Sequence, residues 1–326
     1  MNCNIGIDIS KAKIDVAWLR DAATLKVKTK VFANNRDGFT ALLDWLKSQT
    51  DQPLENCFCI MEATGIYHEP LAFWLHDHGV KVTVANPAHV KNFAKGLGTI
   101  HKTDKKDSVI LARYGDMVKP APWQPEPQNI RELKALLARA EALNEDLQRE
   151  ENRLEKAEFS TGSDHIIPSI QGMIEHIKME LDKLNHKIDD HIDKDDKLKA
   201  DQELLLSIPA IGKVTSRLML AVIRSRAFNN AGECAAFLGV IPQLQESGIC
   251  RGRTTLSKKG NPMIRAKLYM AAVVAGQYNP CIIKQRERLL NNGKTKMQAL
   301  GAAMRKLVHI CFGVLKTQTQ YKPQAA

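Results

Sequence analysis

Two carboxylates in the segment KTDKKDSVILA have a spacing that suits metal chemistry. Asp104 and Asp107 stand three positions apart, so on a helix their side chains share one face about one turn apart. Lys102, Lys105 and Lys106 surround them. Such a pair serves either a salt-bridged surface or a divalent metal that binds a nucleic-acid phosphate, and the segment alone leaves both interpretations open.

Two other acids occur where a lone charge would be costly. Asp8 lies inside the apolar run IGIDIS, and Glu62 ends the apolar run CFCIME. If these runs are adjacent strands, both acids can face the helical pair Asp104 and Asp107. Each acid alone is more often structural, Asp107 as a helix cap and Glu62 as a partner of a lysine. Together they repel unless cations neutralise them, and oxygen ligands without Cys or His suit Mg²⁺ or Mn²⁺. The set predicts a two-metal phosphodiester-cleaving site.

The elements that position these acids are predicted to form a mixed α/β domain over residues 1–128. Strand patterns occupy 3–10, 13–19 and 28–34, and later strands alternate with helices. We expect a helix over 38–49, a strand over 57–63, a helix over 68–79 and a strand over 81–86. This order indicates a sheet with helices packed on it. Four prolines between 120 and 127 exclude a continuous helix there and favour a domain boundary.

Residues 129–206 are acidic and carry a heptad pattern, with 12 bases against 19 acids over 131–206. The first seam runs from Leu133 to Leu154 and the second from Ile170 to His191, in steps of four and three. The pattern predicts two helices that form either an antiparallel hairpin or an oligomerising coiled coil. Polar seam positions are expected to fix the register, namely Asn144, Glu151 and His191.

Residues 207–326 are strongly basic, with 19 bases against 3 acids, and are predicted to be mostly helical. The segment LLLSIPAIGKVTSRLMLAVI matches a helix-hairpin-helix, whose turn brings backbone N–H groups to a phosphate. A helix-turn-helix in a packed helical domain can have the same pattern. Six bases without an intervening acid favour contact with a phosphate backbone over a merely solvated face: Arg251, Arg253, Lys258, Lys259, Arg265 and Lys267.

The composition of all 326 residues favours a polyanionic partner, since the formal net charge is +11 and the pI is about 9.3. We expect neither a membrane span nor a signal peptide, and therefore a cytoplasmic location. None of the seven cysteines forms a CxxC pair. Small core residues are the expected role for them, and a zinc site is not expected.

The motifs GIDIS, MEATG and KTDKKDSVILA occur in an order that resembles the RuvC-like DEDD transposases of bacterial insertion sequences, the insertion-sequence one-ten family. The resemblance continues in SIPAIGKVTS, FLGVIPQLQESG and RGRTTLSKKGNPMIRAKLYMAA. It implies a ribonuclease-H-like domain that holds Mg²⁺ through Asp8, Glu62, Asp104 and Asp107. It also implies that Ser247, in QESG, is a nucleophile.

The same resemblance implies a recombinase that moves its own element, with double-stranded donor and target DNA as substrates. A structured non-coding bridge RNA would pair with both DNAs. The protein would act as a homo-oligomer, a dimer or a tetramer, in the bacterial cytoplasm at the nucleoid.

Several alternatives stay open at this level. A RuvC-like Holliday-junction or structure-specific endonuclease would use metal-activated water and leave the serine idle. A sugar-kinase or actin-like ATPase shares the GIDIS strand but needs a glycine-rich phosphate turn. A nucleic-acid-binding scaffold with degenerate acids would cleave nothing. Residue types alone also do not separate Ser247 from Ser257 as the nucleophile.

Overall fold

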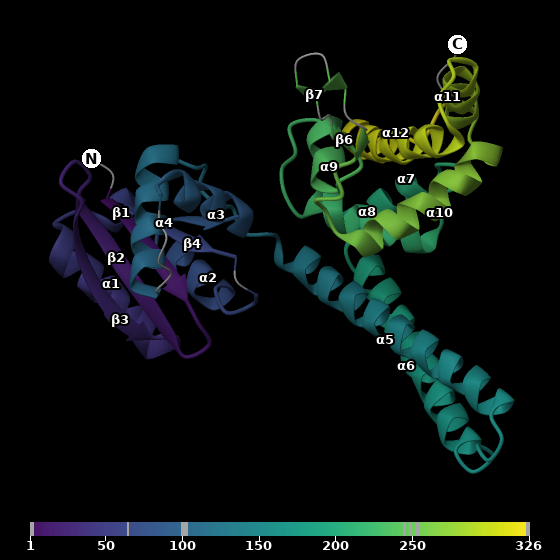
Figure 1. Cartoon of the computed structure of the whole chain (residues 1–326), viewed down its shortest axis with the longest axis horizontal. Helices are drawn as coiled ribbons and strands as arrows, with labels where there is room; N and C mark the ends of the chain where they lie inside the picture. The colour runs from purple at the N-terminus through teal and green to yellow at the C-terminus, as the bar shows by residue number, and fades with distance from the viewer. Residues whose placement is uncertain are drawn as a thin grey trace. The chain divides into compact units, whose positions relative to one another are not determined.

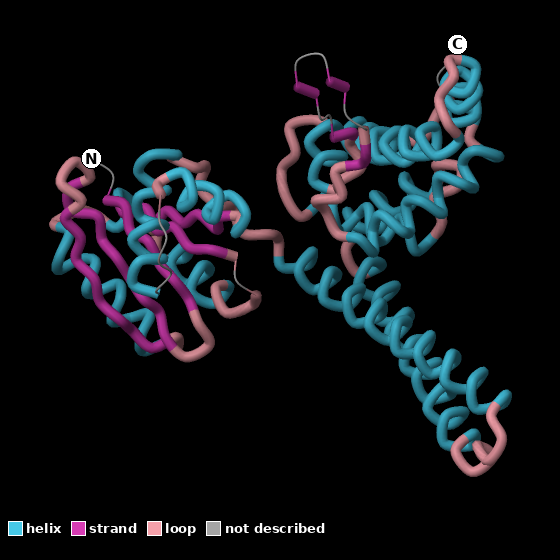
Figure 2. Tube along the Cα trace, in the orientation of Figure 1, coloured by secondary structure: helices cyan, strands magenta, loops and turns pink. Residues whose placement is uncertain are grey.

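The computed structural model describes residues 3–63, 65–98, 104–243, 246–247, 250–251 and 254–323. It describes the backbone but not the side chains of six of these, namely Asp104, Lys105, Glu246, Ser247, Cys250 and Arg251. Packing divides the chain into two compact units, Met1–Pro125 and Glu126–Ala326. Figures 1 and 2 show the elements of each unit.

The first unit is built on a mixed sheet in the order β3-β2-β1-β4-β5. Its strands are β1 (Cys3–Ile9), β2 (Lys13–Asp21), β3 (Lys26–Ala33), β4 (Cys57–Glu62) and β5 (Lys81–Ala85). The first three strands form an antiparallel meander, whereas β4 and β5 run parallel to β1. The mixed α/β fold is therefore confirmed, and it is consistent with a ribonuclease-H-like domain.

Helices cover both faces of this sheet (Figure 1). On one face, α1 (Arg36–Thr50) and α2 (Glu69–Asp77) pack on alternate strand residues such as Ile5, Ile7 and Met61. On the other face, α3 (Pro87–Gly96) and α4 (Asp104–Val118) pack on Phe58 and Ile60. A short 3₁₀ helix, η1 (Leu54–Asn56), leads into β4.

The cysteines behave as small core residues in the described part of the chain. Six of them are free thiols, and all except Cys281 are buried. Burial raises the pKa of Cys59 well above its usual range. The hydrogen bond with the Cys3 thiol lowers the pKa of Cys57 to about 7. Among the described residues, no cysteine belongs to a group that could hold a metal ion.

The second unit begins with a helical hairpin of α5 (Gln128–Phe159) and α6 (Ile167–Asp193). The two helices pack side by side along their length (Figure 1), burying seam residues that include Leu133, Ala140, Ile177 and Ile188. The pairing thus takes place within one chain. Asn144 donates a hydrogen bond to the carbonyl of Ala140 on its own helix, so its side-chain amide has a hydrogen-bond partner within α5.

The remaining helices form a bundle that shares one apolar core with the base of the hairpin. They are α7 (Asp196–Leu206), α8 (Lys213–Arg224), α9 (Ala231–Phe237), α10 (Pro262–Tyr278), α11 (Pro280–Asn291) and α12 (Lys296–Thr317). A turn from Ser207 to Gly212 joins α7 to α8, which pack on each other. The division into 1–128, 129–206 and 207–326 stays a prediction of separate roles.

Short strands form a two-stranded ribbon between α9 and α10 (Figure 2). At its base β6 (Pro242–Gln243) pairs with β9 (Thr255–Leu256), and farther out β7 (Glu246–Ser247) pairs with β8 (Cys250–Arg251). Within the described residues, no helix has the length and apolar character needed to cross a membrane.

Candidate active site

Asp8 and Glu62 end up on neighbouring strands at one edge of the sheet. The parallel β1–β4 register pairs Ile7 with Met61, and each acid is the next residue of its strand. Both acids are half-buried. Because the carboxyl ends of parallel strands meet at one edge, the two acids lie side by side, as the motifs predicted.

Both acids also lie on the face of the sheet that α4 covers. A Cβ on Gly115 of α4 would come within 2.2 Å of the Ile60 side chain, so Ile60 faces α4. Glu62 is two residues farther along β4 and therefore shares that face. Gly6 is likewise two residues before Asp8 and contacts the same helix. The alternation of strand side chains thus directs both carboxylates toward α4.

Gly6 lets the helix come unusually close to the sheet. A Cβ at this position would lie 1.8 Å from the carbonyl oxygen of Ser108 and 2.4 Å from the amide nitrogen of Ala112. Any side chain would therefore push α4 away. The approach brings the part of α4 from Ser108 to Ala112 against β1, and Asp107 comes directly before this part in the chain.

The direction of α4 is antiparallel to β1. At the amino end of β1, Asn4 donates a 3.0 Å hydrogen bond to Asp116 near the end of α4, whereas Gly6 meets Ser108 and Ala112. Continuing along β1 toward Asp8 therefore leads toward the start of the helix, where Asp104 and Asp107 lie. All four predicted acids belong to elements that converge on this edge of the sheet.

Among the described side chains, no three or more Asp, Glu, His or Cys residues form a group that could hold a metal ion. The side chain of Asp104 lies outside the described residues. The four-acid set therefore remains a prediction, supported by the placement of its elements and by an all-oxygen donor set.

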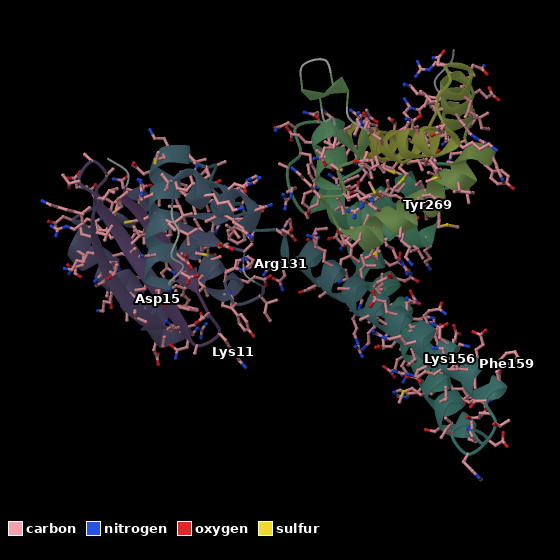
Figure 3. The ribbon with its side chains drawn as sticks, in the orientation of Figure 1. Lys11, Asp15, Arg131, Lys156, Phe159 and Tyr269 are labelled. Carbon is pink, nitrogen blue, oxygen red and sulfur yellow. The ribbon has the colours of Figure 1, made fainter. Side chains whose placement is uncertain are left out.

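Asp15 is a fifth acid at this location that the motifs did not indicate. The antiparallel β1–β2 register places it directly opposite Asp8, so the two side chains share the α4 face. Its side chain is 13% exposed and forms a 2.9 Å ion pair with Lys13. Figure 3 marks Asp15 on the sheet and Lys11 toward the β1–β2 turn. The signal was present in the hairpin spacing, since a tight turn after Ile9 fixes which residue faces Asp8.

The predicted nucleophile, Ser247, belongs to the outer half of the ribbon. It lies on β7 opposite Cys250 of β8, and its side chain is outside the description. The rival Ser257 lies at the base, where its amide donates to the carbonyl of Ile241. Its hydroxyl oxygen is buried with no hydrogen-bond partner among the described residues. A buried hydroxyl at the base of the ribbon is poorly placed to reach DNA, which favours Ser247.

The six predicted DNA-contacting bases differ in availability. Lys258 and Lys259 are exposed, and close packing of Gly239 against Gly260 holds their backbone against the end of α9. By contrast, the Arg265 guanidinium donates to the carbonyl of Gly260, and Lys267 forms a 3.6 Å ion pair with Glu141 of α5. The side chain of Arg251 and the whole of Arg253 lie outside the described residues.

The positive charge next to the predicted helix-hairpin-helix turn is also partly neutralised by a carboxylate. Lys213, at the start of α8, pairs with Asp189 of α6 at 2.6 Å, and Arg217 pairs with the same carboxylate. Burial alone would raise the pKa of Asp189, but the hydrogen bonds from both cations more than offset it and hold the pKa below its usual range. The phosphate-binding role of this turn stays a prediction.

Comparison with known proteins decides which family carries this arrangement. Residues 5–157 match the model of a transposase domain of the DEDD type, and residues 202–287 match that of the IS116/IS110/IS902 transposases. A pilin gene-inverting protein of Moraxella bovis is 34% identical over 316 residues, which are 96% of this chain and 95% of that protein. A protein of the same name from Moraxella lacunata is equally similar.

The chain belongs to this transposase family. It is accordingly a DNA-recombining enzyme, and DNA is its expected substrate. The DEDD domain of the transposase further indicates the use of divalent metal in general. The first matched region includes the end of the sheet that carries Asp8 and Glu62, called the carboxylate edge below, and the second includes the ribbon with Ser247.

Proposed function

We propose that this transposase cuts and rejoins DNA by transesterification, with Ser247 as the nucleophile and Mg²⁺ held by Asp8, Glu62, Asp104 and Asp107. The observation that carries the proposal is the β1–β4 register, which sets Asp8 beside Glu62 on the face of the sheet where α4 approaches Gly6 with Ser108 and Ala112. When bound, divalent ions at such an edge would neutralise the charge on the phosphoryl oxygens and on the attacking and leaving oxygens.

In the proposed step the Ser247 hydroxyl oxygen attacks the scissile phosphorus. A phosphorus–oxygen bond forms to the serine, and the bond to the leaving sugar oxygen breaks. The serine gives up its proton, and the leaving oxygen takes one up. A serine hydroxyl is a weak nucleophile at neutral pH, so it needs an activating partner. The phosphoserine keeps one phosphodiester bond for each broken bond, so rejoining to another strand needs no ATP.

The carboxylate edge and Ser247 belong to different compact units. The chemistry therefore requires both units, from one chain or from two copies, to act on one phosphate. The Moraxella relatives are named for inverting a pilin gene. We propose the corresponding cut-and-rejoin reaction for this chain, with a bridge RNA as the guide that pairs with donor and target DNA.

Trapping the covalent intermediate tests this proposal. Purified protein is incubated with end-labelled donor DNA and Mg²⁺, and a denaturing gel shows whether protein stays attached to the DNA. Ser247→Ala should lose the adduct, whereas Ser257→Ala, its matched control, should keep it. Cleavage without any adduct in the unmodified protein would contradict the serine mechanism and favour hydrolysis by metal-activated water.

The guide is tested separately. The protein is purified from cells that express the whole element, and the bound nucleic acid is sequenced. We expect one discrete structured RNA with segments complementary to donor and target. Recombination by protein that has been stripped of RNA would overturn the guide proposal without affecting the serine mechanism.

A further inference from the structure

A cavity of about 900 Å³ lies in the first unit at the amino end of β1, away from the carboxylate edge. Cys3 and Asn4 of β1 line it, whereas Asp8 and Glu62 do not. Its volume is within the range of small-ligand sites. Trp18 of β2, which is half-buried, contributes an aromatic side chain to its mostly apolar lining, and Phe58 of β4 lines it from the opposite face of the sheet.

Three cationic side chains surround this cavity, namely Arg20, Lys81 and Lys119. All three are exposed, and none forms an ion pair with a carboxylate of the described residues. The Arg20 guanidinium lies 5.5 Å from the centroid of the Trp18 ring, within cation–π distance. The cations stand where a ligand in the cavity would meet them.

The two acids of the lining are already engaged. Asp21 accepts hydrogen bonds from the Thr24 hydroxyl and from the amides of Thr24 and Ala23, and these bonds hold its pKa below the usual range. Asp116 accepts the hydrogen bond from Asn4. Neither carboxylate forms an ion pair with Arg20, Lys81 or Lys119, so these three cations outnumber the two acids of the lining and can meet an anionic ligand.

The proline-rich wall of the cavity is tied to the sheet. Thr83 of β5 donates a 2.9 Å hydrogen bond to the carbonyl of Ala121, and the amide of Trp123 donates to the carbonyl of Val82 at 2.7 Å. Pro120 and Pro122 lie in this segment and line the cavity. Their fixed φ angles and these two bonds make the wall a preformed surface.

We propose that this cavity binds single-stranded nucleic acid, with a base against Trp18 and phosphates on Arg20, Lys81 and Lys119. An aromatic side chain such as Trp18, next to cations that form no ion pair among the described residues, is a combination that binds single strands with little dependence on sequence. The ligand is recognised by its base-and-phosphate chemistry, which a free nucleotide shares. The cavity is separate from the carboxylate edge, so binding of a single strand in the cavity requires neither metal nor cleavage.

Binding by the full-length protein in EDTA tests the site without the metal reaction. Fluorescein-labelled 12-nucleotide single strands of DNA and RNA are titrated at several salt concentrations. Charge reversal with Arg20→Glu plus Lys119→Glu should weaken binding at low salt by about ten-fold or more. The slope of log affinity against log salt should fall by about 0.7 for each lost phosphate contact.

The matched control carries the same change of charge in the same unit. Lys30→Glu plus Lys91→Glu alters two exposed lysines on β3 and α3 that do not line the cavity, and it should bind nearly as the unmodified protein does. Equal losses in the two double variants would overturn the proposal, because binding would then follow net charge alone. Thermal melting of each variant verifies that it is folded.

Two further arms identify the occupant. Crosslinking with 5-iodouracil strands should modify the peptide that contains Trp18, and Trp18→Leu should lose that adduct. Displacement of the strand by micromolar mononucleotide would support the same chemistry with a free nucleotide as its source. Displacement instead by an acidic peptide copied from α5, without any Trp18 crosslink, would overturn the proposal in favour of a protein ligand.

Discussion

The two compact units use their carboxylates in opposite ways. In the second unit, acids form ion pairs with bases that lie far from them in the sequence. Asp189 pairs with Lys213, and Glu141 pairs with Lys267. In the first unit, Asp8, Asp15 and Glu62 are brought together on one face of adjacent strands. The difference teaches that acids of one chain can serve two purposes: those of the second unit form ion pairs that join its helices, whereas those of the first unit share one face of the sheet, where the proposed metal site would lie.

The largest effect on strand cleavage is expected from variants that remove an acid of the carboxylate edge. Asp8→Asn and Glu62→Gln should each reduce strand cleavage by about 10³-fold, because each removes a negative ligand from the charge-stabilising site. The same variants should lose the rise in melting temperature that Mn²⁺ gives the unmodified protein. Quantified cleavage gels and thermal melts with and without metal measure both effects.

Asp44→Asn is the control for these variants, since Asp44 is an exposed acid of α1 in the same unit. It should cleave like the unmodified protein. Full cleavage by Asp8→Asn would remove the metal interpretation altogether, and the sheet-edge acids would then be structural like those of the second unit.

The second prediction concerns the close approach that creates the edge. Gly6→Ala should destabilise the first unit by about 3 kcal/mol, since its Cβ would overlap the Ser108 carbonyl and force α4 outward. Gly96→Ala in α3 is the matched control, because a Cβ there meets nothing within 4 Å. Urea unfolding monitored by tryptophan fluorescence measures both. Equal stabilities for the two variants would show that α4 is not held at Gly6.

How much of this arrangement the sequence could predict depends on the range of the interactions. Apolar patterns and turns correctly predicted the five strands and the helices α1 and α2 of the first unit, and with them the neighbouring positions of Asp8 and Glu62, but not α3. Those patterns depend on residues a few positions apart. Asp15 escaped notice because its partnership with Asp8 depends on the exact register of a hairpin.

Long-range ion pairs escaped prediction for a related reason. The run from Arg251 to Lys267 contains no acid, yet Lys267 meets Glu141 of α5, more than a hundred residues away. Only tertiary packing brings such partners together. A count of bases therefore overstated the charge that is free to contact DNA, whereas Lys258 and Lys259 are exposed, as the predicted contact with a phosphate backbone requires.

The third prediction tests whether Asp15 belongs to the carboxylate edge. Asp15→Asn keeps the shape of the side chain but removes the charge opposite Asp8, and it releases Lys13 from its ion pair. As a positioning residue, it should weaken activation by Mn²⁺ by about ten-fold while leaving cleavage at saturating metal nearly unchanged. Cleavage rates across a metal titration separate these two parameters.

Asp21→Asn provides the comparison on the same strand, because Asp21 is engaged by its own turn at the far end of β2. It should leave the metal dependence unaltered. An Asp15→Asn protein with an unchanged metal titration would place Asp15 with the structural acids, joined to Lys13 only.

The smallest expected effect concerns the second unit, where a carboxylate stabilises the fold through ion pairs. The ion pairs of Asp189 with Lys213 and Arg217 join α6 to α8, and they hold the pKa of Asp189 below its usual range. A depressed pKa contributes stability above the unfolded-state pKa, about 3.9 for Asp, and that contribution is lost as the pH falls through the folded-state pKa. Asp189→Asn should therefore lower stability by about 1 kcal/mol at pH 7, with the difference shrinking toward pH 3. Urea unfolding at successive pH values measures this, with Asp190→Asn, an exposed neighbour on α6, as the control. A deficit that stayed constant across this range would mean that packing, and not the charge of Asp189, joins the hairpin to the bundle.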